Sequence, residues 1–153
     1  MLSVSAEKKG LALSCDISPD VYTKLKGDSG RLRQVLVNIV GNAIKFTSDG
    51  FVKISIKPCC PTQDGKENIK FEVEDTGIGI PPEQKHKLFT AFEQIGSSSE
   101  KRYSGTGLGL TISKSLVKLL GGDIDFESKF GEGLNFGLPY HSKNILMNKV
   151  SIL

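Results

Sequence analysis

The sequence holds few of the residues that metal centres and disulfide frameworks require. Among its 153 residues are three cysteines, Cys15, Cys59 and Cys60, and two histidines, His86 and His141. None of these five residues has a partner at the spacing of a zinc site. Because an odd number of cysteines without such spacing is typical of reduced thiols, we expect a cytosolic domain that binds no zinc.

Long hydrophobic runs and a strong excess of one charge are also missing. No apolar run approaches the roughly 18 residues that span a bilayer, and the polar segment 1–10 does not resemble a signal peptide. Lysine and arginine number 20 against 17 acidic residues; without the tail after Pro139, which has two lysines and no acid, the counts are 18 and 17. This balance argues against nucleic-acid binding through a broad basic face, and we expect no direct membrane contact.

Glycine, in contrast, is abundant. The 17 glycines are about 11% of the chain, against roughly 7% in an average protein, and eleven of them lie between Gly77 and Gly137. Hydrophobic residues make up 38% and charged residues 24%, which is typical of a soluble globular chain of one compact domain. We assign this domain to residues 1–139 and treat 140–153 as a tail or linker.

Periodicity predicts the elements of this domain. Asp28 suits the N-cap of a helix that extends to about Phe46, with its apolar residues on one stripe. We predict further helices at 82–92 and 108–120, strands at 11–17, 51–57, 69–75, 123–128 and 134–139, and a mobile loop at 93–104. Because hairpin connections dominate, the order predicts an α+β fold, a two-layer sandwich with a mixed, mainly antiparallel sheet and about three helices on one face.

The long helix carries a second stripe opposite the apolar one. Asn38, Asn42 and Lys45 stand at positions i, i+4 and i+7, so they span only about 60° of the helix circumference. Asparagine is a poor helix former, whereas an amide oxygen can ligate Mg²⁺ and a lysine can neutralise a phosphate. The stripe is either a solvated face or part of a site for a magnesium-bound phosphate compound, and the residue types favour the site.

Two glycine-rich segments are candidates for the same site. Residues 75–80, Asp-Thr-Gly-Ile-Gly-Ile, form either an ordinary turn after a strand or a place where Asp75 accepts a hydrogen bond from a ligand amine such as that of adenine. Residues 105–110, Gly-Thr-Gly-Leu-Gly-Leu, stand where a loop becomes a helix, and backbone N–H groups there favour an anion. The sequence has no dinucleotide-binding fingerprint, Walker P-loop, or HRD or DFG signature of protein kinases.

Taken together, five segments closely resemble the signature boxes of histidine kinases. In chain order they are 38–47 (Asn-Ile-Val-Gly-Asn-Ala-Ile-Lys-Phe-Thr) for the N box, 75–80 for the first glycine box, 89–94 (Phe-Thr-Ala-Phe-Glu-Gln) for the F box, 105–110 for the second glycine box and 131–133 (Gly-Glu-Gly) for the final glycine box. The resemblance covers about residues 9–139 and is strongest to hybrid sensor kinases. It implies the Bergerat-type ATP-binding fold.

This resemblance implies ATP and Mg²⁺ as cofactors. Asn42 would ligate the Mg²⁺ that bridges the ATP phosphates, with Asn38 beside it, and Lys45 would contact the phosphates. Asp75 would bind the adenine amine. The other implied contacts are Gly77, Gly79 and Ile80 at the adenine, Gly105, Thr106, Gly107 and Gly109 at the phosphates with Leu108 beneath them, Phe89 and Phe92 at the base of the lid, Asn135 on the adenine side, and Lys101 or Arg102 at the γ-phosphate. For the two phenylalanines, plain core packing is the alternative.

One position separates the functions of this superfamily. The related gyrase, mismatch-repair and heat-shock chaperone ATPases have a glutamate general base four residues before the Mg²⁺-binding asparagine, whereas this sequence has Asn38 there. Because an amide cannot take a proton from water at neutral pH, the resemblance favours a kinase over a hydrolysing ATPase. The alternatives are an ATPase or conformational clamp of the same superfamily, or a non-catalytic nucleotide-binding module that regulates a partner.

The resemblance also implies partners outside this chain. In such kinases the phosphorylated histidine lies on a separate helical domain, and neither His86 nor His141 has its sequence context. We therefore expect a histidine phosphoacceptor and dimerisation domain and a downstream receiver domain as partners. The isolated domain is expected to be a cytoplasmic monomer and the full-length protein a homodimer, with membrane anchoring of the full-length protein left open.

Overall fold

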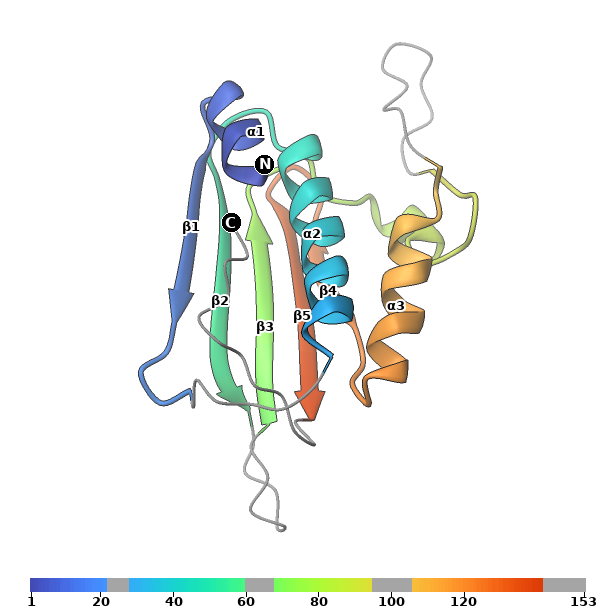
Figure 1. Cartoon of the computed structure of the whole chain (residues 1–153). Helices are drawn as coiled ribbons and strands as arrows, with labels where there is room; N and C mark the ends of the chain where they lie inside the picture. The colour runs from blue at the N-terminus through green and yellow to red at the C-terminus, as the bar shows by residue number, and fades with distance from the viewer. Residues whose placement is uncertain (22–27, 60–67, 95–105, 142–153) are drawn as a thin grey trace.

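The computed structural model describes residues 1–21, 28–59, 68–94 and 106–141, with the side chains of 140 and 141 excepted. Helices cover one face of a five-stranded sheet (Figure 1), which confirms the two-layer α+β sandwich predicted from the sequence. In chain order the elements are α1 (Leu2–Lys8), β1 (Ala12–Ile17), α2 (Ser29–Phe46), β2 (Phe51–Cys59), β3 (Asn68–Asp75), the 3₁₀ helix η1 (Pro82–Lys87), α3 (Gly109–Leu119), β4 (Asp125–Lys129) and β5 (Gly133–His141).

The sheet has the strand order β1-β2-β3-β5-β4, in which β1 is parallel to β2 and all other pairs are antiparallel. Its register places Asp75, the last residue of the central strand β3, opposite Val52 on one side and Leu134 on the other. Successive side chains of a strand point to opposite faces. Phe71, Val73 and Asp75 therefore face the helices, and this brings Asp75 beneath the helical layer.

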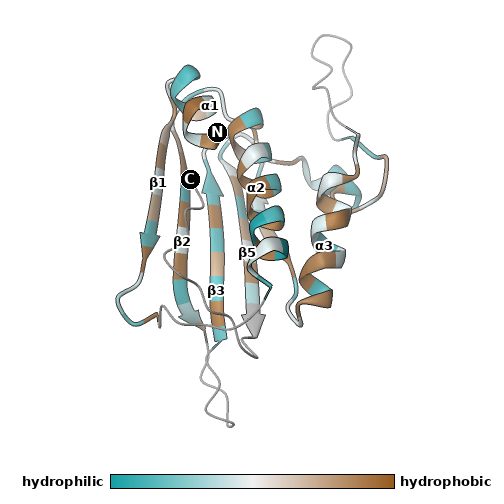
Figure 2. Ribbon diagram, viewed as in Figure 1, coloured by the Kyte–Doolittle hydropathy of each residue, from teal (hydrophilic) through white to brown (hydrophobic). Residues whose placement is uncertain are grey.

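Helix α2 packs its apolar stripe onto the sheet. The Asp28 side chain accepts a hydrogen bond from the Arg31 N–H at 3.0 Å, which confirms the predicted N-cap. The hydropathy colouring shows brown positions recurring along the helices and the strands (Figure 2). The predicted stripe is confirmed, because all of its members are buried: Leu32, Val35, Leu36, Ile39, Val40, Ala43 and Ile44.

The opposite face of the sheet is polar. The Lys57 and Lys70 ammonium groups lie 2.7 and 2.8 Å from the Glu72 carboxylate, and Lys53 lies 2.9 Å from Asp16. Hydrogen bonds from the two lysines lower the pKa of Glu72. Lys57 and Lys70 stand directly opposite each other on β2 and β3, and the Glu72 carboxylate that contacts both offsets the repulsion between these like charges. These ion pairs explain how the sheet presents this face to water while its other face forms the core.

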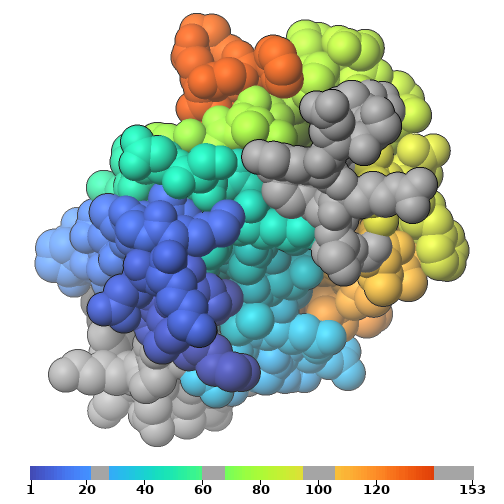
Figure 3. Space-filling view, turned by 90° about the horizontal axis from the view of Figure 1, so that it is seen from above, coloured from blue at the N-terminus to red at the C-terminus, as the bar shows by residue number. Residues whose placement is uncertain are grey.

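The N-terminal segment was not predicted as a helix, yet residues 2–8 form α1. Ala6 and Leu11 are only 1% and 6% exposed, so this segment adds to the core. From above, the blue N-terminal residues are seen beside the teal residues at and after the end of α2 (Figure 3). The sequence pattern was too short to show a helical period, and the packing against α2 supplies the stability that the segment lacks alone.

Other boundaries differ in detail. The predicted helix 82–92 is wrong in its second half, because η1 ends at Lys87. Phe92 has a non-helical φ of 63°, and its N–H donates to the Gly107 carbonyl at 3.2 Å. Strand β5 extends to His141, past the expected domain end at 139. Most of the loop expected at 93–104 lies outside the described residues. In the described ranges, no helix is both long and apolar enough to cross a membrane.

The orientation of α2 gives the first prediction. Ile39 is fully buried against the sheet, whereas Val37, two residues earlier, is 41% exposed. Ile39→Ala should lower the free energy of unfolding by about 2–5 kcal/mol, because it removes buried methyl groups and leaves a cavity. The matched change Val37→Ala should alter it by less than about 0.5 kcal/mol. Urea denaturation measures both, and equal losses would contradict the orientation.

Candidate functional site

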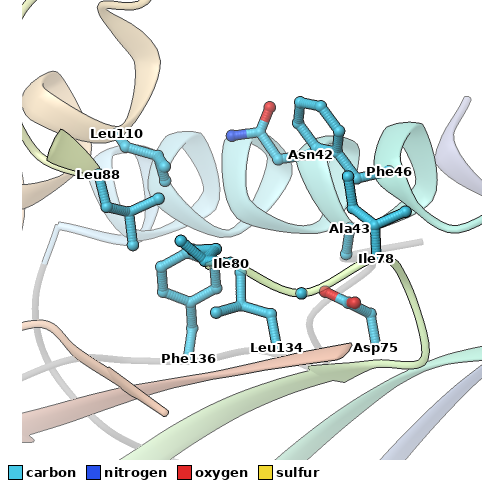
Figure 4. Close-up of a pocket in the computed structure, with 11 residues that line it drawn as sticks. Asn42, Ala43, Phe46, Asp75, Ile78, Ile80, Leu88, Leu110, Leu134 and Phe136 are labelled. Carbon is cyan, nitrogen blue, oxygen red and sulfur yellow. The ribbon is translucent and has the colours of Figure 1, made fainter. Parts of the chain in front are cut away.

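A pocket opens between α2 and the sheet, at the end of the sheet where the central strand β3 terminates. It encloses about 520 Å³ of empty space, including space open to solvent. Figure 4 shows how helix α2, the loop after β3, strand β5 and the start of α3 contribute its walls. Only two of the lining side chains are polar, Asn42 and Asp75. The lining residues are Asn42, Ala43, Phe46, Asp75, Ile78, Gly79, Ile80, Leu88, Leu110, Leu134 and Phe136.

Asp75 lies at the floor of this pocket. It is only 6% exposed, and its Oδ1 accepts a hydrogen bond from the Gly77 N–H at 2.9 Å. Burial raises the pKa of its carboxyl, and the backbone hydrogen bonds from Gly77 and Leu134 only partly oppose this shift. A buried carboxylate gains most from a further donor, because ionisation without partners is costly in an apolar pocket. The floor therefore suits an apolar ring that carries an amine.

Thr47 adds a second polar atom beside Asp75, which the sequence reasoning did not assign. Its side chain is fully buried, and among the described residues its Oγ1 has no hydrogen-bond partner. A Cβ on Gly77 would lie 3.0 Å from this Oγ1 and 2.9 Å from Asp75 Oδ1, so the two polar groups flank Gly77. An unpaired buried hydroxyl costs stability, which points to a ligand or a water as its partner. The only available signal was its place at the end of the N box.

Strand β4 and the final glycine box together hold the first glycine box in place. The Gly131 N–H donates to the Ile78 carbonyl at 2.8 Å, and the Ile80 N–H donates to the Ser128 hydroxyl at 2.8 Å. Gly79 has a φ of +63°, and a Cβ there would lie 2.2 Å from a carbonyl oxygen of β4. Any other residue at Gly79 would therefore be both strained and in collision. These contacts fix the loop that forms the pocket wall after Asp75.

The polar stripe of α2 divides between two environments. Asn42 lines the mouth of the pocket and also a groove between α2 and α3. Asn38 instead contacts α3: its Nδ2 donates to the Ser113 hydroxyl at 2.9 Å, and a Cβ on Gly109 would lie 2.5 Å from its Oδ1. Glycine at 109 thus lets α3 approach Asn38 closely. Lys45 lies outside the pocket lining, with its ammonium 5.0 Å from the centre of the Phe46 ring.

The donor chemistry fits a magnesium ion at Asn42. Mg²⁺ usually takes few protein ligands and completes its shell with water and substrate phosphates. Among the described residues, the Asn42 amide makes no hydrogen bond that would compete with an ion, and no three His, Cys, Asp or Glu residues gather as a metal cage. A single amide oxygen at the mouth of a pocket therefore suits an ion that arrives with a phosphate compound.

Several predicted contacts lie away from the pocket lining. Phe89 packs edge-on against Phe126 with ring centroids 5.7 Å apart, and the Lys114 ammonium lies 4.6 Å from its ring centre, which favours the packing alternative. Phe92 is 77% exposed. Three residues of the second glycine box, Thr106, Gly107 and Leu108, precede α3 without lining the pocket. Lys101, Arg102 and Gly105 lie outside the described residues.

Asn135 needs a correction, because the structure places it on the opposite face of the sheet. In the register Leu134 pairs with Asp75 and lines the pocket, whereas Asn135 pairs with Glu74. Asn135 lines a polar groove on the outer face with Glu74 and Lys53. A shift of one residue along a strand moves a side chain to the other face. Leu134, and not Asn135, therefore lines the pocket beside Asp75.

Comparisons with known proteins agree with this geometry. Residues 27–141 match the family described as histidine kinase-, DNA gyrase B- and HSP90-like ATPases. The chain is 44% identical over 137 residues to hybrid signal transduction histidine kinase B of Dictyostelium discoideum. This match covers 89% of this chain and 7% of that protein. It is 43% identical over 136 residues to the signal transduction histidine-protein kinase BarA of Escherichia coli K12, which covers 89% of this chain and 15% of BarA. The chain thus spans a small part of both relatives.

Solved structures have the same fold. Full-length ShkA in complex with AMPPNP superposes with a TM-score of 0.76 at 32% identity, covering 99% of this chain and 29% of ShkA. A nucleotide-free catalytic domain of the histidine kinase ThkA superposes with a TM-score of 0.71 at 26% identity, covering 92% of this chain and 86% of that domain. These neighbours confirm the fold expected from the five boxes.

The environment of Asp75 predicts a pH dependence of stability without ligand. Because its pKa is raised in the folded state, the folded protein holds a proton that the unfolded chain has released above the ordinary aspartate pKa of about 4. The contribution of Asp75 to stability is therefore fully present at acid pH and falls as the pH rises through its folded pKa. Asp75→Asn removes this titration.

Urea denaturation of both proteins between pH 4 and 7 measures the effect. The free energy of unfolding of the wild type, minus that of Asp75→Asn, should fall with rising pH. Other titrating groups are common to both proteins and cancel in this difference. A difference that stays constant or rises with pH would show that the pKa of Asp75 is not raised in the folded protein.

Proposed function

This chain belongs to the family of histidine kinase-, DNA gyrase B- and HSP90-like ATPases, and on that premise we propose that it binds Mg-ATP and donates the γ-phosphoryl group to a histidine outside this chain. The observation that carries the proposal is the buried Asp75 carboxylate at the floor of a pocket whose other described lining side chains, apart from Asn42, are apolar. An adenine ring would fill the apolar space and its exocyclic amine would donate to this carboxylate. The AMPPNP complex of ShkA supports a nucleotide in this fold.

Asn42 is our candidate ligand for the magnesium ion. Its amide lies at the pocket mouth, where the phosphates of a bound nucleotide would leave the apolar floor. The ion would neutralise phosphate charge when bound. Lys45, one helical turn further along α2, adds a positive charge near the same opening. In this arrangement the chain itself positions the nucleotide, and catalysis comes from orientation and charge neutralisation.

The chemistry at Asn38 favours transfer over hydrolysis. A hydrolytic enzyme needs a base that takes a proton from water, and an amide cannot do so at neutral pH. The Asn38 amide is moreover occupied with Ser113 of α3, so the helix offers no base at this position. An ATPase or conformational clamp of the same superfamily is therefore the weaker candidate, and a non-catalytic nucleotide-binding module is the other alternative.

The acceptor and the signalling partners would lie on other domains. The curated relatives are named as histidine kinases, and this chain covers 7% of one and 15% of the other. We propose that a histidine phosphoacceptor and dimerisation domain receives the phosphoryl group, and that a receiver domain acts downstream. The isolated domain would be a cytoplasmic monomer, and the full-length protein would be a homodimer.

Binding assays with a fluorescent ATP analogue and with adenosine test the site. Asn42→Ala should weaken Mg²⁺-dependent ATP binding by about tenfold or more and leave adenosine binding unchanged, because only the phosphate compound carries the ion. Asn135→Ala is the matched control, since this asparagine lies on the outer face and should leave both affinities unchanged. Equal losses for the two variants, or no loss for Asn42→Ala, would exclude Asn42 as the magnesium ligand.

Phosphoryl transfer is tested with the helical phosphoacceptor domain of a hybrid histidine kinase and γ-labelled ATP. We expect acid-labile label on the acceptor, and none when the acceptor histidine is replaced by glutamine, because the nucleophile is supplied by the partner. Release of inorganic phosphate should be slow, since the Asn38 amide cannot act as a general base. Rapid phosphate release without labelled acceptor would favour the ATPase alternative.

A further inference from the structure

Lys9 makes an unusual set of contacts at the end of α2. Its ammonium donates to three backbone carbonyls, those of Ile44, Lys45 and Thr47, at 2.7, 2.8 and 3.1 Å. All three donors of the ammonium group are thereby used. A positive charge at this end of a helix is also favourable, because the carbonyl end carries the negative pole of the helix dipole. Lys9 thus caps a helix that belongs to a different part of the chain.

The position of Lys9 is itself fixed. It follows α1, where the Leu11 N–H donates to the Ala6 carbonyl at 3.0 Å and closes the turn. Ala6 and Leu11 are both buried in the core, so the turn between them is anchored on both sides. Figure 3 shows this N-terminal segment, in blue, at the end of the molecule where α2 terminates. The long side chain therefore extends from a fixed base to the end of α2.

Each of the last four carbonyls of α2 has a defined partner. The Ala43 carbonyl accepts from the Thr47 N–H at 3.0 Å, and those of Ile44 and Lys45 accept from Lys9. The fourth, the Phe46 carbonyl, accepts from the Ile78 N–H at 3.4 Å. Helix ends normally leave these groups without helical partners. Here Lys9 holds two of them and the pocket loop holds the next.

The end of α2 is also a wall of the pocket. Phe46 and Ile78 both line it, and a Cβ on Gly77 would lie 2.7 Å from the Phe46 carbonyl. The loop that follows Asp75 is therefore packed directly against the last turn of α2. Any change in the direction of this turn would shift the loop and with it the space above the Asp75 carboxylate.

We propose that Lys9 is a positioning residue for nucleotide binding, which fixes the last turn of α2 and thereby the adenine side of the pocket. This inference rests on the proposed function, because it assigns Lys9 a role in that same site. Lys9 acts through backbone carbonyls and does not touch the nucleotide. It also connects the N-terminal segment of the domain to the pocket wall, so a displacement of that segment would be transmitted to the end of α2 through this side chain.

The test compares Lys9→Met, Lys9→Arg and the matched control Lys8→Met, which removes a charge from the neighbouring exposed position. We expect Lys9→Met to weaken ATP and adenosine binding equally, by about three- to tenfold, because the loss of the cap loosens the pocket wall. Lys9→Arg should restore most of the affinity, and Lys8→Met should bind as the wild type does. Urea denaturation of each variant checks that it is fully folded at the assay temperature.

Each outcome has one meaning. If the folded Lys9→Met protein binds both ligands with wild-type affinity, the cap is only structural and the proposal is wrong. If ATP binding alone weakens, Lys9 acts as a distant charge on the phosphates, which also overturns positioning. If the wild type itself binds neither ligand, the proposed function fails, and this result is distinguishable because it does not depend on any Lys9 variant.

Discussion

The packing of α2 on the sheet is the interaction on which the site depends. Its buried apolar stripe fixes how the helix is rotated, so the polar positions opposite that stripe have defined directions. Asn42 then faces the mouth of the pocket, and Asn38 faces α3. The same rotation sets where the helix ends, and its last turn becomes the wall against which the loop after Asp75 packs. One hydrophobic face thus places every polar group of the helix.

The floor of the pocket is held at a cost to stability. Asp75 is a carboxylate whose burial raises its pKa, and the Thr47 hydroxyl beside it has no partner among the described residues. The surrounding structure tolerates both polar groups because the loop after Asp75, which passes between them at Gly77, is fixed on two sides. Gly131, in the turn between β4 and β5, binds the Ile78 carbonyl, and Ser128 of β4 binds the Ile80 N–H. The end of α2 binds the Ile78 N–H. A site that binds an amine-bearing ring requires polar groups with unfilled hydrogen-bonding capacity, held rigidly in an apolar pocket.

The sequence was sufficient where a single element carries the signal. Periodicity located α2, its cap and its buried stripe, and the order of five boxes located the fold. It was insufficient where two elements meet. The resemblance placed Asn135 at the adenine, although the alternation of side chains along β5 puts it on the outer face. Lys9 and Thr47 were not assigned, because the hydrogen bonds of Lys9 and the missing partner of Thr47 depend on contacts between distant parts of the chain. The helix expected to 92 failed for the same reason, since the Phe92 N–H is held by Gly107.

At Asn38 the chemistry of the side chain is linked to the packing of α2 against α3. A glutamate at this position is one methylene longer than asparagine, and it would need the space in which Asn38 already lies against Gly109 and Ser113. It would also lose the amide donor that the Ser113 hydroxyl accepts. A glutamate pointing in the same direction would therefore crowd the first turn of α3 at Gly109. On the proposed function, Asn38 therefore has two roles: it leaves this position without a base, and it joins α2 to α3 through Ser113 and Gly109.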